Sequence, residues 1–203
     1  MERFVVIVLA AALVALLVVY LVRGPTPSSG PRPSPAPAPT TAAPAPPGAL
    51  REPGPPANAD RMRVLRVYDG DTMTVVPTGG GEGRPVRLIG IDTPELRPAQ
   101  CYAKQAAQAL RRLARPGSTV TLAPDRTKKD RYGRWLRYVW NDRGVFVNGA
   151  LAREGAAYAL AVKPDVTYQD LFAVLVRQAR AERRGLWGAC PNPRPPVHGT
   201  RSS

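Results

Sequence analysis

The stretch MRVLRVYDGDTMTVV, residues 62–76, decides the fold of this chain of 203 residues. Its two halves are rich in apolar and β-branched residues, and Asp69-Gly70-Asp71 lies between them. Asp-Gly between two β-rich runs is typical of a hairpin turn. A glycine-rich segment at 78–83 predicts a second turn, and residues 86–91 form a third apolar run. The sequence therefore predicts three consecutive strands joined by turns.

Helical and strand-like patterns alternate in the rest of the domain. Apolar side chains at helical spacing predict a helix over 101–115. Two strands, a short helix and a longer helix capped by Thr167 are predicted next, over residues 118–123, 135–140, 147–154 and 167–184. Five short strands with about three helices fit a mainly β fold of the α+β class, a small closed barrel of the OB type. An open antiparallel α+β sheet fits the pattern nearly as well.

The ends of the chain are predicted to lie outside this domain. Residues 4–22 are 19 uncharged residues, enough to cross a bilayer as a helix. Residues 1–23 are therefore predicted to be a transmembrane signal anchor or a cleaved signal peptide. A proline-rich disordered linker over 24–59, a folded domain over 60–190 and a disordered tail over 191–203 complete the prediction. The domain is expected outside the cytoplasm, membrane-anchored or secreted.

Composition narrows the range of functions. The formal net charge of +14 favours polyanionic partners such as nucleic acids. The only histidine is His198, in the tail, so the domain cannot use a Ser-His-Asp triad, a histidine base or an imidazole zinc site. Cys101 and Cys190 flank most of the domain. In an exported protein they would form one disulfide; the alternative is two unrelated buried thiols.

Three polar clusters carry the candidate chemistry. They are Asp69-Gly-Asp71, Arg87-Leu-Ile-Gly-Ile-Asp-Thr-Pro-Glu95 and Asp130-Arg-Tyr-Gly-Arg134. Each alone is consistent with an ordinary turn or loop. If the strands pair, however, Asp71, Asp92 and Glu95 converge, and clustered carboxylates without histidine or thiolate specify a hard cation such as calcium or magnesium. Arginines beside such a site suit a phosphate group, because a guanidinium can hold two of its oxygens.

These clusters resemble the staphylococcal-nuclease-like (thermonuclease) family. The three motifs stand in the family's order, followed by Val-Asn-x-x-Leu-x-x-x-Gly at 147–155 and by Gly-Leu-Trp at 185–187. The match covers roughly residues 61–188. Any one motif would be weak evidence, but five in order are specific. The resemblance implies an OB-fold barrel with helices packed on it.

The resemblance also implies a role for each candidate residue. Calcium would be held by Asp71, Asp92 and the backbone carbonyl of Thr93, with Asp69 acting through water. Glu95 would hold the attacking water, and Arg87 and Arg134 would clamp the phosphate. Arg131 and Tyr132 would contact a terminal phosphate of the substrate. Two tyrosines of the family's type member correspond to Leu160 and Val162 here, so the resemblance implies weaker base stacking unless Tyr158 substitutes for them.

Three functions remain open at this stage. The first is an exported, calcium-dependent nuclease that cuts DNA and RNA, preferring single-stranded or frayed regions, and acts as a monomer. The second is a noncatalytic, membrane-tethered receptor for nucleic acid. The third, a structural surface protein on a proline-rich stalk, accounts for residues 1–59 but not for the clustered charges.

Overall fold

The computed structural model describes residues 52–195. The predictions for residues 1–23, for the linker up to residue 51 and for the tail from residue 196 lie outside the described residues. Within residues 52–195, no helix is long and apolar enough to cross a membrane.

The described part of the chain contains seven strands and four helices. The strands are β1 (Asp60–Val67), β2 (Thr72–Pro77), β3 (Arg84–Leu88), β4 (Ile91–Asp92), β5 (Thr119–Ala123), β6 (Trp135–Asn141) and β7 (Tyr158–Ala159). The helices are α2 (Ala103–Leu113), α3 (Val147–Arg153), α4 (Gln169–Ala181) and α5 (Leu186–Ala189). Strand β7 was not predicted from the sequence, because a two-residue strand carries no periodic pattern.

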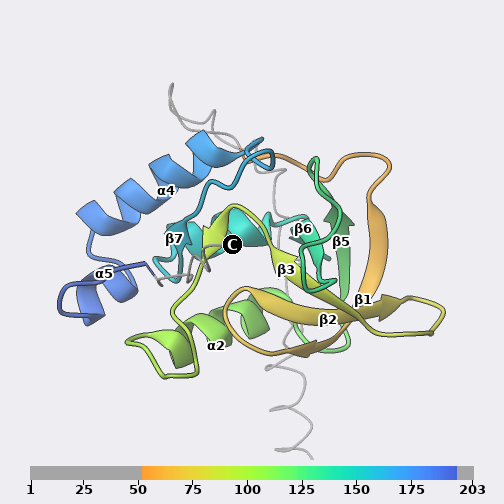
Figure 1. The fold of residues 1–203 in the computed structure, drawn as a ribbon, viewed down its shortest axis with the longest axis horizontal. Helices are drawn as coiled ribbons and strands as arrows, with labels where there is room; N and C mark the ends of the chain where they lie inside the picture. The colour runs from red at the N-terminus through yellow and green to blue at the C-terminus, as the bar shows by residue number, and fades with distance from the viewer. Residues whose placement is uncertain (1–51, 196–203) are drawn as a thin grey trace, which may run out of the picture. The chain divides into compact units, whose positions relative to one another are not determined.

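Five of the strands close into a barrel in the order β1-β2-β3-β6-β5 (Figure 1). β1 pairs antiparallel with both β2 and β5, which closes the barrel, whereas β3 pairs parallel with β6. The predicted five-stranded OB-type barrel of the α+β class is therefore confirmed, and the open sheet is excluded. The parallel pair needs a long crossover connection, which α2 and β5 provide between β3 and β6.

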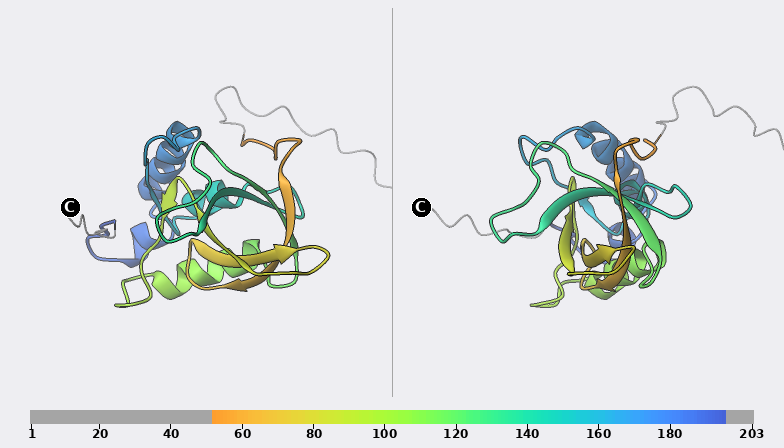
Figure 2. Two further views of the ribbon diagram at one scale, coloured as in Figure 1. Left: turned by 45° about the vertical axis from the view of Figure 1, so that its right-hand side comes forward. Right: turned by 90° about the vertical axis from the view of Figure 1, so that its right-hand side faces the viewer.

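Alternation along the strands fills the barrel. Inward positions with no exposed surface are Val64, Met73, Val75, Val86, Leu88, Val120 and Leu122. An aromatic group extends this core toward α4: the ring of Phe146 stacks 5.1 Å from Trp140 and 5.8 Å from Phe172. Figures 1 and 2 show α2 along one side of the barrel and α4 along another. The helices thus extend a core that is already closed.

The predicted strand over 86–91 is interrupted in the structure. β3 ends at Leu88, a turn follows, and β4 leaves the barrel to pair with β7. The turn requires Gly90, because its φ is +82° and a Cβ there would lie 2.1 Å from the ring of Phe172. The prediction of one continuous strand was wrong, since a glycine within an apolar run does not reveal its backbone conformation. The bend allows side chains on either side of it to meet.

Thr167 does not cap the helix that follows it. α4 begins at Gln169, and the Thr167 backbone N–H and hydroxyl donate instead to the two carboxylate oxygens of Asp125, at 3.0 and 2.9 Å. Asp125 also accepts a hydrogen bond of 2.9 Å from the Tyr138 hydroxyl. The predicted cap was wrong because a distant carboxylate binds both donor groups of the threonine. Asp125 thereby ties the β5–β6 loop to the segment before α4.

A buried amide holds the turn after β3 in place. Asn148, with no exposed surface, accepts from the Val139 backbone N–H and donates to the Ile89 carbonyl, both at 2.9 Å. Buried polar groups of this kind are costly unless paired, so both bonds fix the local geometry. Asn148 therefore joins α3, β6 and the β3–β4 turn, and it does so at Ile89, two residues after Arg87.

Candidate active site

Arg87 lies at the centre of a nearly buried acidic cluster. It projects from β3, and its guanidinium is 3.2 Å from Asp71 Oδ2 and 2.8 Å from Asp92 Oδ1. It also donates to the backbone carbonyls of Leu88, at 2.6 Å, and Ile91, at 3.0 Å. These carbonyls lie on either side of the β3–β4 bend. The two hydrogen bonds therefore stabilise the bend and fix the position of the Arg87 guanidinium. Two predicted metal-binding carboxylates thus converge on one predicted catalytic arginine.

The Asp-Gly-Asp turn positions Asp71. Asp69 Oδ1 accepts hydrogen bonds from the backbone N–H groups of Asp71, at 3.0 Å, and Thr72, at 2.7 Å, which closes a tight turn. A Cβ on Gly70 would lie 2.7 Å from the Thr93 hydroxyl, so only glycine allows this approach. Burial, and secondly the negative charge of Asp71, raise the pKa of Asp69 to about 6.

Thr93 joins the turn to the end of β4. Its backbone N–H and its hydroxyl both donate to Asp71 Oδ2, each at 2.9 Å. Asp71, Asp92 and Thr93 are all buried. The three residues predicted to bind calcium therefore lie in one cluster, although Asp71 and Thr93 are 22 positions apart in the sequence.

Glu95 opens a compact turn beyond this cluster. Its side chain is half-buried. Its backbone N–H donates to Gln100 Oε1 at 2.8 Å, and its carbonyl accepts from the Gln100 N–H at 2.9 Å. The next residue, Cys101, forms a disulfide with Cys190, so the predicted pair is joined in the structure. The disulfide ties the far end of the Glu95 turn to the C-terminal end of the described chain.

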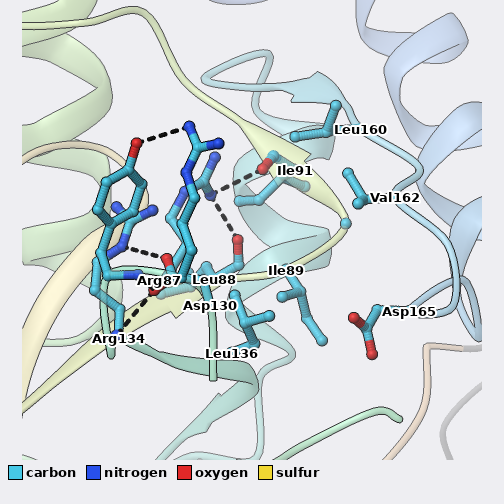
Figure 3. A pocket seen from close by; sticks show the side chains of 13 residues that line it. Arg87, Leu88, Ile89, Ile91, Asp130, Arg134, Leu136, Leu160, Val162 and Asp165 are labelled. Carbon is cyan, nitrogen blue, oxygen red and sulfur yellow. Dashed lines mark hydrogen bonds and ion pairs between the residues drawn. The ribbon is translucent and has the colours of Figure 1, made fainter. Parts of the chain in front are cut away.

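A cleft of about 1210 Å³ begins at Arg87. Figure 3 shows Arg87 and Arg134 on one side of it and Leu160 and Val162 on the other. Arg131 and Tyr132 also line it, whereas Asp71, Asp92 and Glu95 are not among its lining residues. Arg87 is therefore the residue shared by the acidic cluster and the cleft. The two arginines predicted to clamp the phosphate, Arg87 and Arg134, therefore line the same cleft. The predicted substrate-binding residues Arg131 and Tyr132 line it as well.

Asp130 organises the basic loop on this side of the cleft. Its Oδ1 accepts from the backbone N–H groups of Tyr132 and Arg134, both at 2.9 Å, and its Oδ2 is 2.7 Å from Arg134 Nε. The Arg131 guanidinium donates to the Tyr132 hydroxyl at 2.7 Å. The carboxylate of Asp130 thus fixes the turn and aims Arg134. Sequence reasoning included Asp130 in a motif but assigned it no role.

Asp165 is a second residue that sequence reasoning missed. It is buried, lines the cleft and accepts a hydrogen bond of 2.7 Å from the Thr127 backbone N–H. Together with Asp125, it fastens the basic loop to the segment that carries Leu160 and Val162. No sequence pattern near Asp165 indicates this, because its partner lies 38 residues away.

Comparison with known proteins gives a consistent result. The family model described as staphylococcal nuclease homologue matches residues 85–189, which is half of the chain. The chain belongs to this family. It is 38% identical to a thermonuclease of Staphylococcus hyicus over 64% of this chain and 78% of the relative. It is 35% identical to a thermonuclease of Staphylococcus intermedius over 69% and 83%, respectively. An uncharacterised endonuclease of Escherichia coli O157:H7 is 36% identical over 66% of this chain and 80% of the relative.

Proposed function

We propose that this member of the staphylococcal nuclease family is a calcium-dependent nuclease that hydrolyses phosphodiester bonds of DNA and RNA outside the cytoplasm. Family membership and the thermonuclease and endonuclease relatives support the hydrolytic activity. The observation that carries the proposal is the convergence of Asp71 and Asp92 on Arg87, which lines the same cleft as Arg134. Carboxylates and arginines at one place suit a metal and a phosphate.

The residues present fit a hard cation. Within residues 52–195 no three His, Cys, Asp or Glu side chains are grouped to hold a metal ion. The proposed set uses only two carboxylates, those of Asp71 and Asp92, with the carbonyl of Thr93. Calcium commonly completes such a set with water, and oxygen donors without sulfur or imidazole favour it over transition metals. The ion would supply a Lewis acid that polarises a phosphoryl oxygen.

The chain's own residues supply the remaining chemistry. Phosphodiester hydrolysis gathers negative charge on the non-bridging oxygens, and the permanently charged guanidinium groups of Arg87 and Arg134 would stabilise it. Glu95 would orient a water molecule toward phosphorus and accept its proton. Arg131 and Tyr132, at the outer edge of the cleft, would contact a further phosphate. Asp69 would support the ion through water.

The cellular location is also part of this proposal. The apolar segment 4–22 and the disulfide between Cys101 and Cys190 support export, because disulfides persist in oxidising compartments. We place the domain outside the cytoplasm, membrane-anchored through this segment or secreted after its cleavage. We propose that the domain acts as a monomer.

The direct test is to incubate the purified chain with single-stranded DNA or RNA, in calcium or in EGTA. Calcium-dependent shortening of both polymers is expected. A receptor would instead bind the polymers tightly without cleaving them, and that result would reject the proposed activity. Magnesium in place of calcium, at equal concentration, tests which hard cation the site accepts.

A further inference from the structure

The outer side of β1 carries an unusual set of exposed side chains. Met62, Val64 and Val67 are buried inside the barrel. Between Val64 and Arg66 the register with β2 shifts, so Leu65 is the extra residue of a β-bulge and points outward with its neighbour. Arg61, Arg63, Leu65, Arg66 and Tyr68 are therefore all exposed, and we call these five residues the β1 face.

The β1 face is uniformly positive. Among residues 52–195, no carboxylate forms an ion pair with Arg61, Arg63 or Arg66. Their partners across the strands are uncharged: threonine or valine at every paired position. The one acid of the strand is Asp60, which lies near the buried Arg137. Burial lowers the pKa of Arg137, and the negative charge of Asp60 partly raises it again. Three guanidinium groups therefore face solvent without a balancing charge.

Exposed apolar surface accompanies this charge. Four large hydrophobic side chains are exposed in the described part of the chain: Leu65, Tyr68, Tyr132 and Val162. The last two line the cleft. The first two belong to the β1 face, where Tyr68 is 42% exposed and the Arg66 guanidinium lies 3.9 Å from the centre of its ring. Among residues 52–195, the two exposed tyrosines therefore lie in the cleft and on the β1 face, each with an arginine beside its ring.

The β1 face is continuous with the strand that carries Arg87. The Tyr68 backbone N–H donates to the Thr72 carbonyl at 2.9 Å, and the Thr74 hydroxyl donates to the Tyr68 hydroxyl at 3.3 Å. Thr72 pairs in turn with Arg87. Residues opposite one another in a sheet share a face, so Tyr68 and Arg87 leave the same side of the barrel. Two strand spacings separate their backbones by about 10 Å. In Figure 1, β1 lies on the right, away from α4 and α5.

We propose that the β1 face binds the same nucleic acid strand that enters the cleft, as an extended second contact beside the active site. Arginines separated by one or two residues along a strand can follow successive phosphates, and an exposed tyrosine can stack on a base. This inference rests on the proposed nuclease function for the identity of the ligand. It predicts that the β1 face strengthens the binding of long strands but not of dinucleotides, and that it leaves the chemical step at the scissile bond unchanged.

The test compares Arg63→Ala/Arg66→Ala with Arg143→Ala/Arg177→Ala in the full-length chain, purified in detergent. Both double variants remove two exposed arginines that form no ion pair among the described residues, but the control pair lies on the β6–α3 turn and on α4. Binding to single-stranded DNA of about 15 nucleotides, near the upper limit for an OB fold, is measured by anisotropy in EGTA at several salt concentrations. Two lost phosphate contacts should reduce the slope of log K against log salt by about 1.4. The control should keep the wild-type slope.

Tyr68 gives an independent variant. Tyr68→Ala should weaken binding of the long strand by about 5-fold or more, because stacking on one base is lost. Tyr68→Phe, which keeps the ring, should bind nearly as tightly as the wild type. In calcium, cleavage of a dinucleotide should be unchanged in Tyr68→Ala and in the arginine double variant, whereas KM for the long strand should rise without a change in kcat.

The outcomes separate this inference from the proposed function. If the wild type cleaves nothing in calcium but the β1-face variants still bind DNA more weakly, the nuclease proposal fails and the binding face stands. If these variants bind the long strand as tightly as the wild type, the proposal that the β1 face binds nucleic acid is rejected. That result would also be found if the β1 face bound anionic lipid instead. Equal losses for the dinucleotide and the long strand also overturn it, because the variants would then act through the cleft.

Discussion

Arg87→Met should make the protein depend on calcium for its stability. The substitution removes the cation from between Asp71 and Asp92, both buried, while keeping an unbranched side chain. Breaking a buried ion pair by removing one partner costs about 3–5 kcal/mol. For a domain of this size, that lowers Tm in EGTA by roughly 10–20 °C. The hydrogen bonds from Arg87 to the two carbonyls of the β3–β4 bend are lost as well, which adds to the effect.

Calcium should reverse much of this loss. At the proposed site, calcium in the wild type would share the two carboxylates with Arg87, whereas in the variant it would be the only cation between them. Calcium at a hundred times its Kd stabilises the folded protein by about 2.7 kcal/mol. Because calcium should bind the variant more tightly, it should raise the Tm of the variant more than the Tm of the wild type. Thermal unfolding followed by tryptophan fluorescence, with calcium or EGTA, measures both shifts. Arg143→Met, at an exposed turn, is the control and should behave as the wild type.

Two results would refute the reasoning about Arg87. One is a variant that is as stable as the wild type in EGTA, since the carboxylates would then not need the arginine. The other is a calcium shift no larger in the variant than in the wild type, since the ion would then bind elsewhere. Turnover should be lost in either case if Arg87 also clamps the phosphate, so activity alone does not distinguish these explanations.

Three further predictions concern residues around the site. Asp130→Asn should lower kcat by about 10-fold with little change in stability, because Arg134 loses the charged partner that aims it; a KM effect alone in steady-state assays would contradict this. Cys101→Ser should reduce the free energy of unfolding by about 4–5 kcal/mol, because the disulfide closes a loop of 89 residues; denaturant unfolding tests it, and a loss below about 1 kcal/mol would not fit. Asn148→Ala should cost about 2–4 kcal/mol by leaving two buried backbone groups unpaired, and an unchanged midpoint in urea would show that they find other partners.

The fold could be predicted from the sequence where the signal is local. The Asp-Gly turn at 69–71 and the alternation of β1, β2, β5 and β6 indicated their elements directly. The parallel pairing of β3 with β6 was not visible, because it depends on contacts between segments about 50 residues apart. The bend at Gly90 and the bonds of Thr167 to Asp125 were missed for the same reason: each is decided by a partner distant in the sequence.

The candidate site could be predicted from the sequence only in part. Composition alone could restrict the chemistry to carboxylates, arginines, tyrosines and hard metal ions, and the resemblance to the family implied a role for each candidate residue. What the sequence could not give is the double role of Arg87, which contacts both carboxylates and also lines the cleft. Nor could it give the part of Asp125 and Asp165 in holding the loop that carries Arg134. These roles follow from three-dimensional hydrogen bonds without a sequence pattern.

The most direct test of the central claim is single-turnover cleavage of single-stranded DNA by Glu95→Gln. Glu182→Gln, at the exposed C-terminal end of α4, is the matched control. If Glu95 accepts the proton of the attacking water, the rate in calcium should fall by about 10²–10⁴-fold. DNA binding in EGTA should not change, and the control should cleave at the wild-type rate. Near-normal cleavage by Glu95→Gln, or wild-type cleavage that persists in EGTA, would contradict the account.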